Sequence, residues 1–498
     1  MSAILHRPVR HHSQPGQLPR QDPEFLLPRR LLFHRPHSTT RLRPRPEGSI
    51  NTAPMNVLRL SPPPAGSAVS LLERLRDLFG DIPREGGRVR KLPPAVTLAL
   101  WTVQCLRENL SLRRVLTDHA GWFDGGVPPS EAALAQARKR LDRDQLRAAA
   151  AAVAGALAPA PAGLLDGRRL KAIDGVDFTV EDTPANRAAY SCPAGQAQGC
   201  GFPVLSTLAS LDLATGVLEQ LKLAQWSAHD LRLFLGAPEL IARNDIAVAD
   251  RAFDAFVFLA VVRSRQADAI CRVKNNRRAL SGAKQRIGPG DWKTRLHRPV
   301  RSALLGESQL LQLPGSLPLR LVHAKIEVRG HRSEDLWLAT TLLDAKRHPA
   351  ADILRAYLLR WGIELAFRDV KTSMDAQFLR VKSPEMAEKA VMVFFLSRNF
   401  TRLLVRQSDA ETDGWAASFK QSMGIAANLL GDMAQGFSFA QAFPRCRTAL
   451  LATRFKPKIR PSQPRAVKRR PKPYPYLTAP RSSYREIFHR NRYHKTVI

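Results

Sequence analysis

The segment from Tyr357 to Lys371, YLLRWGIELAFRDVK, has the spacing Tyr-x2-Arg-x3-Glu-x6-Lys. Its apolar residues recur at helical spacing with few breakers, which predicts a helix. At about 100° per residue, Tyr357, Arg360, Glu364 and Lys371 project from one narrow face over about 21 Å. Glu364 could then bind a divalent ion while Arg360 and Lys371 hold phosphate oxygens. An amphipathic helix with a solvated charged face would carry the same residues, so the choice between the two depends on other carboxylates.

Two aspartates upstream lie in strand-like sequence. Asp174 is part of RLKAIDGVDFTV and precedes Gly175, whose missing side chain would let a phosphate approach closely. Asp250 follows the apolar run IAVA, so its side chain can emerge at the edge of a sheet. Either residue alone is more often a cap or turn residue. Other acids compete for the two positions, namely Asp177 or Asp182 for the first and Asp245 or Asp254 for the second.

The ordered set Asp174, Asp250 and Glu364, with the Tyr-Arg-Glu-Lys spacing attached, resembles the DDE transposases of bacterial insertion sequences. The resemblance extends from about Leu71 into the basic C-terminal tail and is strongest around the three acids. It implies an α/β fold with a ribonuclease-H-like catalytic core. The implied reaction is DNA strand cleavage by water, followed by transfer of the new 3′-hydroxyl to another phosphate. The three acids would hold two Mg2+ ions about 3.5–4 Å apart, for which Mn2+ can substitute.

DNA contacts are expected from the same signature. We assign Arg360 and Lys371 to phosphate contacts, and Tyr357 to a phosphate hydrogen bond or to stacking near the cleavage point. Salt bridges and packing are the alternative roles of these three residues. Lys274, just beyond the second acid, is a weaker candidate for a backbone contact. Trp337 resembles the insertion-domain tryptophan that accepts a flipped base in family members that form a hairpin, although a tryptophan in a strand more often packs in the core.

The charge balance also favours a DNA partner. The chain of 498 residues has 77 Lys and Arg against 43 Asp and Glu, a net charge of +34. Such a chain should bind polyphosphate with a steep salt dependence. No basic amphipathic anchor, bilayer-length apolar run or secretory signal stands out, so a membrane partner is not expected. The five cysteines show no zinc-finger spacing, and reduced thiols in the bacterial cytoplasm, at the nucleoid, fit best.

Composition and periodicity, together with what the resemblance implies, divide the chain into six predicted segments. They are a disordered basic extension (1–64), a helical N-terminal DNA-binding domain (65–160), the first part of the catalytic core (165–275), a β-rich insertion (276–345), the second part of the core with the C-terminal helices (346–451), and a basic Pro-rich tail (452–498). Translation could start at Met1 or at Met55. Within the helical domain, Ser130 is a predicted N-cap of one long helix ending near Pro159. Its basic residues, which could bind transposon ends or form a solvated face, are Arg113, Arg114, Arg138, Lys139, Arg140 and Arg143.

The leading interpretation is a transposase that binds the terminal inverted repeats of its element, cuts there and inserts the element elsewhere. A synaptic homodimer on double-stranded DNA is implied by the resemblance, because two ends must be cut and joined together. Two alternatives stay open. One is a DNA-binding regulator or decayed transposase without catalysis, and the other is a metal-dependent nuclease with no strand transfer.

Overall fold

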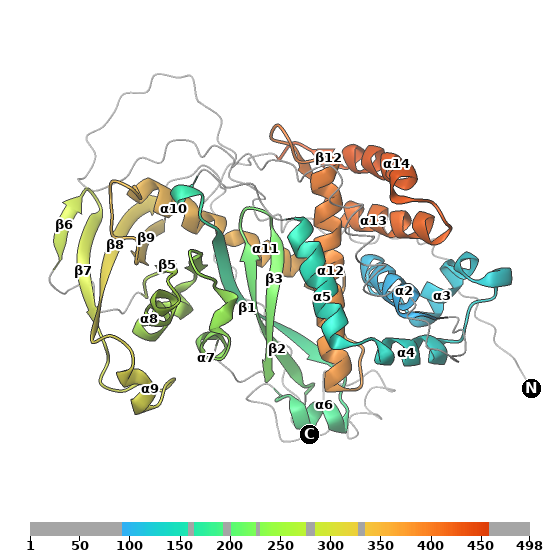
Figure 1. Cartoon of the computed structure of the whole chain (residues 1–498), viewed down its shortest axis with the longest axis horizontal. Helices are drawn as coiled ribbons and strands as arrows, with labels where there is room; N and C mark the ends of the chain where they lie inside the picture. Colours follow the sequence, from blue (N-terminus) through green and yellow to red (C-terminus); the bar gives the residue numbers. More distant parts are fainter. Residues whose placement is uncertain are drawn as a thin grey trace, which may run out of the picture.

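The computed structural model describes residues 92–157, 164–192, 201–225, 230–274, 284–326 and 334–457. Most of the two predicted terminal segments, and the possible start at Met55, lie outside these residues. Figure 1 shows a broad sheet with helices on both faces and a helical region packed against one end of it. The architecture is therefore mixed α/β, in line with the fold class expected from the sequence.

The helical region begins with α2 (Pro94–Leu106), α3 (Leu112–Asp118), α4 (Glu131–Arg140) and α5 (Arg143–Ala156), with short 3-10 turns η1 (Ala120–Trp122) and η2 (Asp124–Gly126) after α3. The hydroxyl of Ser130 accepts from the backbone N–H of Ala133, which confirms the predicted N-cap. The single long helix predicted after it is wrong. Asp142 accepts from the N–H groups of Asp144 and Gln145 and starts a second helix there.

A ten-stranded mixed sheet forms the centre of the described molecule, in the order β3-β2-β1-β4-β5-β9-β8-β7-β6, with β10 beside β1. Its strands are β1 (Leu170–Val180), β2 (Val204–Asp212), β3 (Val217–Gln225), β4 (Ile246–Ala249), β5 (Asp268–Arg272), β6 (Gln285–Gly288), β7 (Asp291–His297), β8 (Ser316–Ile326), β9 (Glu334–Thr340) and β10 (Phe378–Leu379). β1, β4 and β5 are parallel, whereas β2 and β3 form an antiparallel hairpin beside β1. Gly216, at φ 71°, lies in the turn of this hairpin.

One face of the sheet is covered by α7 (Asp230–Leu235), η4 (Pro238–Leu240), η5 (Arg251–Phe253) and α8 (Phe256–Ser264). The opposite face is covered by α10 (Ala350–Leu359), α11 (Trp361–Arg368), the π-helical turn η7 (Asp369–Ser373) and α12 (Pro384–Gln407). Side chains of β1 alternate between the two layers, because Ile173 packs with α7 and α8 while Ala172 and Val176 pack with α12. A residue in β1 can therefore contact either helical layer, depending on its parity.

The predicted β-rich insertion holds β6 to β9 together with α9 (Glu307–Leu311). These strands do not form a sheet of their own, because β9 pairs with β5 and so continues the central sheet. Residues 327–333, between β8 and β9, lie outside the described residues.

The long helix α12 joins the sheet to the helical region. Its 24 residues pack against α2, α5 and β3, and also against α13 (Phe419–Ala434) and α14 (Phe439–Ala452). A small second sheet pairs β11 (Ala416–Ala417) with β12 (Arg454–Phe455). Among the described helices, none combines the length and apolar character that crossing a bilayer requires.

Candidate active site

Asp174 and Asp250 lie on neighbouring parallel strands at the same level of the sheet. The register of β1 with β4 pairs Ala172 with Val248 and Ile173 with Ala249, so the next residues on the two chains are the two aspartates. Parallel strands run about 4.8 Å apart, which keeps consecutive positions close. β4 ends at this point while β1 continues to Val180, so the two carboxylates sit at a step in the sheet edge.

Arg360 links the first aspartate to the third acid. Its Nη2 donates to Oε1 of Glu364 at 2.7 Å, and its Nη1 lies 3.5 Å from Oδ2 of Asp174. The guanidinium side chain is 13% exposed, against 22% for Asp174 and 35% for Glu364. Arg360 therefore supplies a positive charge between two of the three predicted acids, from the helical layer that covers the Asp174 face of β1.

The surroundings of Asp174 disfavour its charged form. The pKa of this carboxyl is raised to about 7, mainly by burial and also by the negative charges of Asp250 and Asp230. Arg360 and the Gly175 N–H oppose this shift. A titratable group so strongly perturbed by burial and by like charges is typical of a functional site. Asp250 has a second role, since its Oδ1 accepts from the N–H of Ala252 and starts η5.

The predicted single helix from Tyr357 to Lys371 is divided in the structure. α10 ends at Leu359, α11 begins at Trp361, and Lys371 lies in the π-helical turn η7. The N–H of Arg360 bonds to the carbonyl of Tyr357 and the N–H of Ile363 to that of Arg360, so the turns around Arg360 are tightened. The expectation of one uninterrupted helix is therefore wrong. Arg360 nevertheless lies beside both Tyr357 and Glu364.

Residues 166–400 match the model of the transposase DDE domain family. This range contains all three acids of the candidate site. Over 408 residues the chain is 24% identical to the transposase InsG for insertion sequence element IS4 of Escherichia coli K12, covering 80% of this chain and 89% of that one. The chain belongs to the DDE transposases of bacterial insertion sequences.

Two further similarities are shorter or weaker. The transposase for insertion sequence element IS421 of Escherichia coli is 32% identical over 100 residues, which is 20% of this chain and 25% of that one. A synaptic complex of piggyBac transposase with hairpin DNA aligns over 79% of this chain and 88% of that one, at a TM-score of 0.41 and 11% identity.

The acids that competed for the two aspartate positions have structural partners in this transposase. Asp177 accepts from the Ser206 hydroxyl at 2.7 Å on the other face of β1. The remaining pairs are Asp182 with Arg187, Asp245 with Lys171 at 3.1 Å, and Asp254 with the backbone N–H of Lys274 at 2.9 Å. These contacts favour Asp174 and Asp250 over their neighbours.

Tyr357 and Trp337, the two aromatic candidates, are both packed. Tyr357 is 8% exposed, and burial raises the pKa of its phenol; the Arg360 guanidinium lies 5.9 Å from its ring centroid. Trp337, on β9, stacks on Trp292 at 5.2 Å and on His323 at 4.4 Å between ring centroids. Trp337 is half-buried, so its indole belongs to a three-ring stack that still reaches the surface.

Two of the basic residues predicted to bind DNA have structural roles. Arg138 is 9% exposed, its guanidinium lies 3.8 Å from the centroid of the Trp101 ring, and Nη1 donates to Gln104. A phosphate contact by Arg138 is therefore wrong, because its charge is held inside the helical region. Arg143 bonds to Glu388 of α12 at 2.9 Å. Lys139 and Arg140, by contrast, are exposed.

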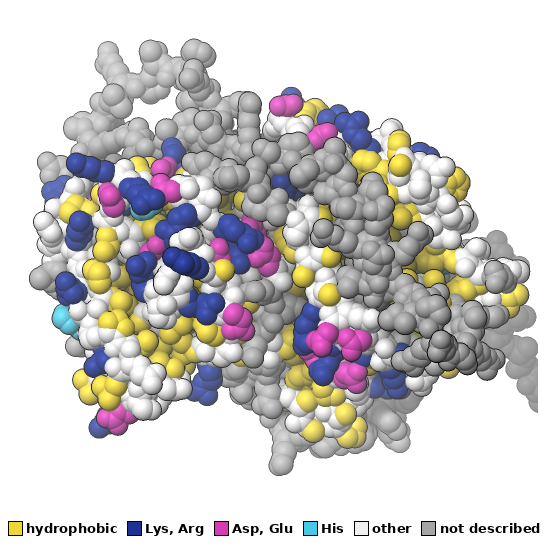
Figure 2. All heavy atoms as spheres, viewed as in Figure 1, with side chains coloured by type: hydrophobic (Ala, Val, Ile, Leu, Met, Phe, Trp, Pro, Cys, Tyr) yellow, Lys and Arg dark blue, Asp and Glu magenta, His cyan; other side chains and the backbone are white. Residues whose placement is uncertain are grey.

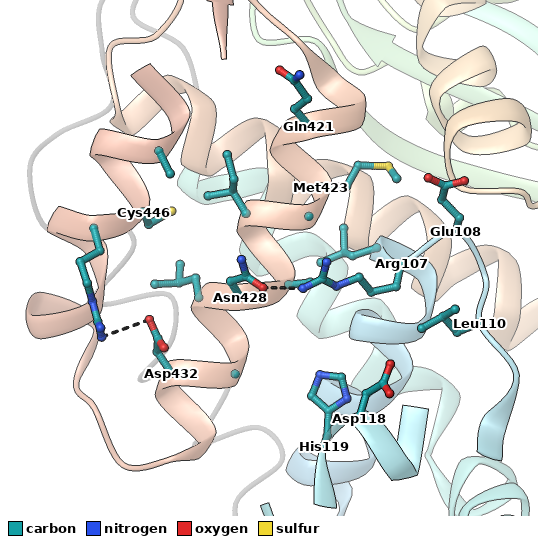
Figure 3. A pocket seen from close by; sticks show the side chains of 18 of the residues that line it. Arg107, Glu108, Leu110, Asp118, His119, Gln421, Met423, Asn428, Asp432 and Cys446 are labelled. Atoms are coloured by element: carbon teal, nitrogen blue, oxygen red, sulfur yellow. Dashed lines mark hydrogen bonds and ion pairs between the residues drawn. The ribbon is translucent and has the colours of Figure 1, made fainter. Parts of the chain in front are cut away.

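A cavity of about 1200 Å3 lies between α2 and α3 on one side and α13 and α14 on the other (Figure 3). None of the three acids and none of the residues of the Tyr-Arg-Glu-Lys signature lines it, whereas Arg114, one of the basic residues predicted to bind DNA, does. Its charged side chains pair with one another or with amides, as in Arg107 with Asn428, Lys420 with Glu108 at 3.1 Å, Arg114 with Asp118 at 2.7 Å, and Arg445 with Asp432 at 3.3 Å. This cavity therefore offers no one-signed surface to a nucleic acid.

Asp230, at the start of α7, was not predicted as part of this region, although its negative charge acts on Asp174. The sequence analysis predicted that Gly175 leaves room for a phosphate. In the structure the Asp230 carboxylate lies in that space.

Proposed function

We propose that this transposase cuts DNA at a site formed by Asp174, Asp250 and Glu364. The observation that carries the proposal is the β1–β4 register, which makes the two aspartates neighbours, together with Arg360, which connects Asp174 to Glu364. Three acids that are 76 and 114 positions apart in sequence thereby belong to one local network. A carboxylate group of this kind is what phosphoryl transfer to water or to a 3′-hydroxyl needs.

The core that holds this site is ribonuclease-H-like in our proposal. Support comes from the five strands β3-β2-β1-β4-β5, in which an antiparallel hairpin precedes two parallel strands and helices lie on both faces. The strands β6 to β9 would then be the insertion between the second and third acids. Their attachment through β5–β9 pairing extends the core toward the DNA that the site must receive.

Divalent cations fit the donor chemistry of the site. Carboxylate oxygens are the ligands that Mg2+ and Mn2+ prefer, and Asp174, Asp250 and Glu364 would hold them. Such ions, when bound, activate the attacking oxygen and neutralise charge on the transferring phosphate. Within the described residues, no three His, Cys, Asp or Glu side chains are gathered closely enough to hold a metal ion. Glu364 is engaged with Arg360, so Glu364 must release this guanidinium to act as a ligand.

Release of Arg360 provides its proposed role in DNA binding. A phosphate oxygen entering the site competes with Asp174 and Glu364 for the guanidinium, which pairs well with phosphate. Tyr357 holds Arg360 from the buried side, and Lys371 contacts the strand further along. Lys274 is a backbone contact near the second acid, and Trp337 stacks on a displaced base at the edge of its aromatic stack.

Double-stranded DNA, as transposon ends and as target, is the partner in this proposal, and a homodimer brings two ends together. On the face viewed in Figure 2, Lys and Arg side chains gather over α8 and the strands β5 to β9. A basic surface of this kind binds the phosphate backbone without regard to sequence. The exposed Lys139 and Arg140 of the helical region add contacts to the end duplex.

The proposal is tested by magnesium-dependent nicking of a duplex that carries the element's terminal repeat. Alanine at Asp174, Asp250 or Glu364 should lower the nicking rate on the order of 10³-fold or more, since several kcal/mol of charge stabilisation are lost. Binding of the same duplex should stay within about twofold, because these residues contribute no positive charge. The matched control is Asp177→Ala on the same strand, which should nick normally.

A variant that cuts at the wild-type rate would remove that residue from the site. Wild-type protein that binds the repeat and never cuts it, with either Mg2+ or Mn2+, would favour a regulator without catalysis. Nicking without any joined product would favour the nuclease.

A further inference from the structure

The side chain of Asp230, at the start of α7, closely approaches β1 at Gly175. A Cβ atom built on this glycine would lie 2.8 Å from Cγ and 3.0 Å from Oδ2 of Asp230, and closer still to Oδ1. Real Cβ atoms do not come this near to a carboxylate. Any side chain at position 175 would therefore displace Asp230, and the glycine is what admits it.

Asp230 reaches this point from the layer opposite to Glu364. Gly175 and Asp174 are consecutive in a strand, so their Cβ directions point to opposite faces of the sheet. α11 lies on the Asp174 face, and α7, which begins at Asp230, lies on the Gly175 face. α7 also packs against η5, the turn that starts at Asp250. Asp230 is thus placed beside the positions of both proposed aspartate ligands.

Asp230 also suits the start of α7 for purely structural reasons. It occupies the first turn of α7, where a carboxylate is favourable because of the helix dipole and the unpaired N–H groups. That explanation accounts for an acid at the helix start but not for the glycine opposite it. A cap needs no access to β1, whereas a carboxylate serving the sheet edge does.

We infer that Asp230 is a fourth carboxylate of the divalent-cation site, delivered from the opposite helical layer through the space that Gly175 leaves. The inference rests on the proposed function and adds a residue to it. Four hard oxygen donors on two helices and two strands would hold the cation from both sides of the sheet step. A ligand on each side also fixes the site without relying on Glu364 alone, which is paired with Arg360.

The test is cation binding rather than activity. Full-length protein is titrated with Mn2+ alone, and free Mn2+ is followed by electron paramagnetic resonance. Asp230→Asn keeps a side chain of the same size at the first turn of α7, so the fold is retained, and it should weaken Mn2+ binding about tenfold or more. The control Glu307→Gln removes an exposed carboxylate from α9 and should bind as wild type does.

Asp174→Asn and Asp250→Asn separate the inference from the proposal beneath it. If both bind Mn2+ as tightly as wild type, the cation site itself is misplaced. If both weaken binding and Asp230→Asn does not, the site stands and Asp230 is only a helix cap. The expected result is that all three weaken binding.

Gly175→Ala tests the access that the glycine provides. The added methyl should push the Asp230 side chain away and lower Mn2+ affinity about as much as Asp230→Asn does, again about tenfold. The double variant should bind no more weakly than either single one, since both remove the same carboxylate. Gly155→Ala, at a helix position with no atom within 4 Å of the new methyl, should have no effect. Additive losses in the double variant would overturn the proposed link between Gly175 and Asp230.

Discussion

Charge is buried in two regions of this transposase, and the two are balanced differently. Along α12, arginines four residues apart meet oxygen acceptors one by one. The contacts are Arg398 with Asp369 at 3.7 Å, Arg402 with Glu411 at 2.7 Å and Arg406 with the Leu157 carbonyl at 2.9 Å. At the step in the sheet, in contrast, the single guanidinium of Arg360 lies beside both Asp174 and Glu364, and the pKa of Asp174 is raised to about 7 by burial and by the charges of Asp250 and Asp230.

The contrast distinguishes charges that stabilise the fold from charges that, in our proposal, serve catalysis. A buried cation with its acceptor in place joins elements, and α12 uses such pairs to connect the sheet to the helical region. A surplus of like charges costs stability and persists where a ligand of opposite sign is to be bound. Substitutions in the two regions should therefore change stability in opposite directions.

The largest stability effect is expected on α12. Arg402→Met leaves Glu411, 15% exposed, without the two hydrogen bonds that Arg402 donates to it. Removing one partner of such a pair should lower the free energy of unfolding by about 3–5 kcal/mol. Urea denaturation measures the change. Arg447→Met breaks an exposed pair with Asp409 at 3.4 Å and should cost less than about 1 kcal/mol. Equal losses in both variants would contradict the distinction.

At the site, neutralising an acid should stabilise the protein when divalent cations are absent. The pKa of Asp174 is about 7 in the folded protein and 3.8 in the unfolded reference. The stability that the protonated carboxyl contributes is therefore fully present below pH 3.8 and is lost as the pH rises through 7. Asp174→Asn avoids this loss. Its free energy of unfolding should rise relative to wild type between about pH 4 and pH 8. The upper limit of this gain is about 4 kcal/mol, and the expected gain is about 2 kcal/mol because the side chain is partly exposed.

Thermal unfolding in EDTA at a series of pH values checks this gain. The exposed control Asp144→Asn should follow wild type throughout. A variant less stable than wild type at pH 8 would mean that the Asp174 carboxylate stabilises the fold. Added Mg2+ should shrink the gain, because the ion stabilises the charged carboxylates only in wild type.

A smaller effect is expected where a buried cation was first taken for a DNA contact. Arg138→Met removes the guanidinium packed on Trp101 and should cost about 1–2 kcal/mol of stability. Binding of the end duplex should not change. The exposed Arg140→Gln should leave stability unchanged and weaken binding. Stability is measured by denaturation and DNA affinity by filter binding. Unchanged stability with weakened binding in Arg138→Met would show that Arg138 contacts DNA.

Local patterns in the sequence were enough to find the elements that carry the acids. Alternation and the apolar run at residues 246–249 predicted β1 and β4, and Ser130 predicted a helix start. What failed was non-local or competed with a local signal. The pairing of β9 with β5 joins residues about 70 positions apart, and no local pattern in the sequence predicts it. Asp142 is a residue type that favours the N-cap of a helix. The apolar periodicity that continues past it nevertheless led us to predict one long helix instead of two.

The candidate site was predictable in its residues and not in its geometry. Glu364 was proposed from the Tyr-Arg-Glu-Lys spacing, and Asp174 and Asp250 from the strand-like sequence around them. The register that pairs Ile173 with Ala249, in contrast, depends on tertiary packing. No proline marks the tightened turn at Arg360, and the nearby Gly362 lies inside α11. The sequence around Asp230 shows no signal of a cation ligand, and the role that we infer for it depends on its proximity to Gly175 in space. A sequence can show which side chains suit a reaction, whereas their direction depends on which layer each element joins.

The smallest effect expected is on the salt dependence of DNA binding. Lys371 lies in the π-helical turn beyond the third acid, and Lys371→Gln should lower the slope of log K against log salt by about 0.9, the value of one phosphate contact. Lys420→Gln is the matched control, because its ammonium is paired with Glu108 at the cavity between α2 and α13. Binding isotherms between about 50 and 200 mM salt resolve the difference. An unchanged slope for Lys371→Gln would place this lysine with the balanced charges of the fold, and the DNA contact of the signature would then fall to Arg360 alone.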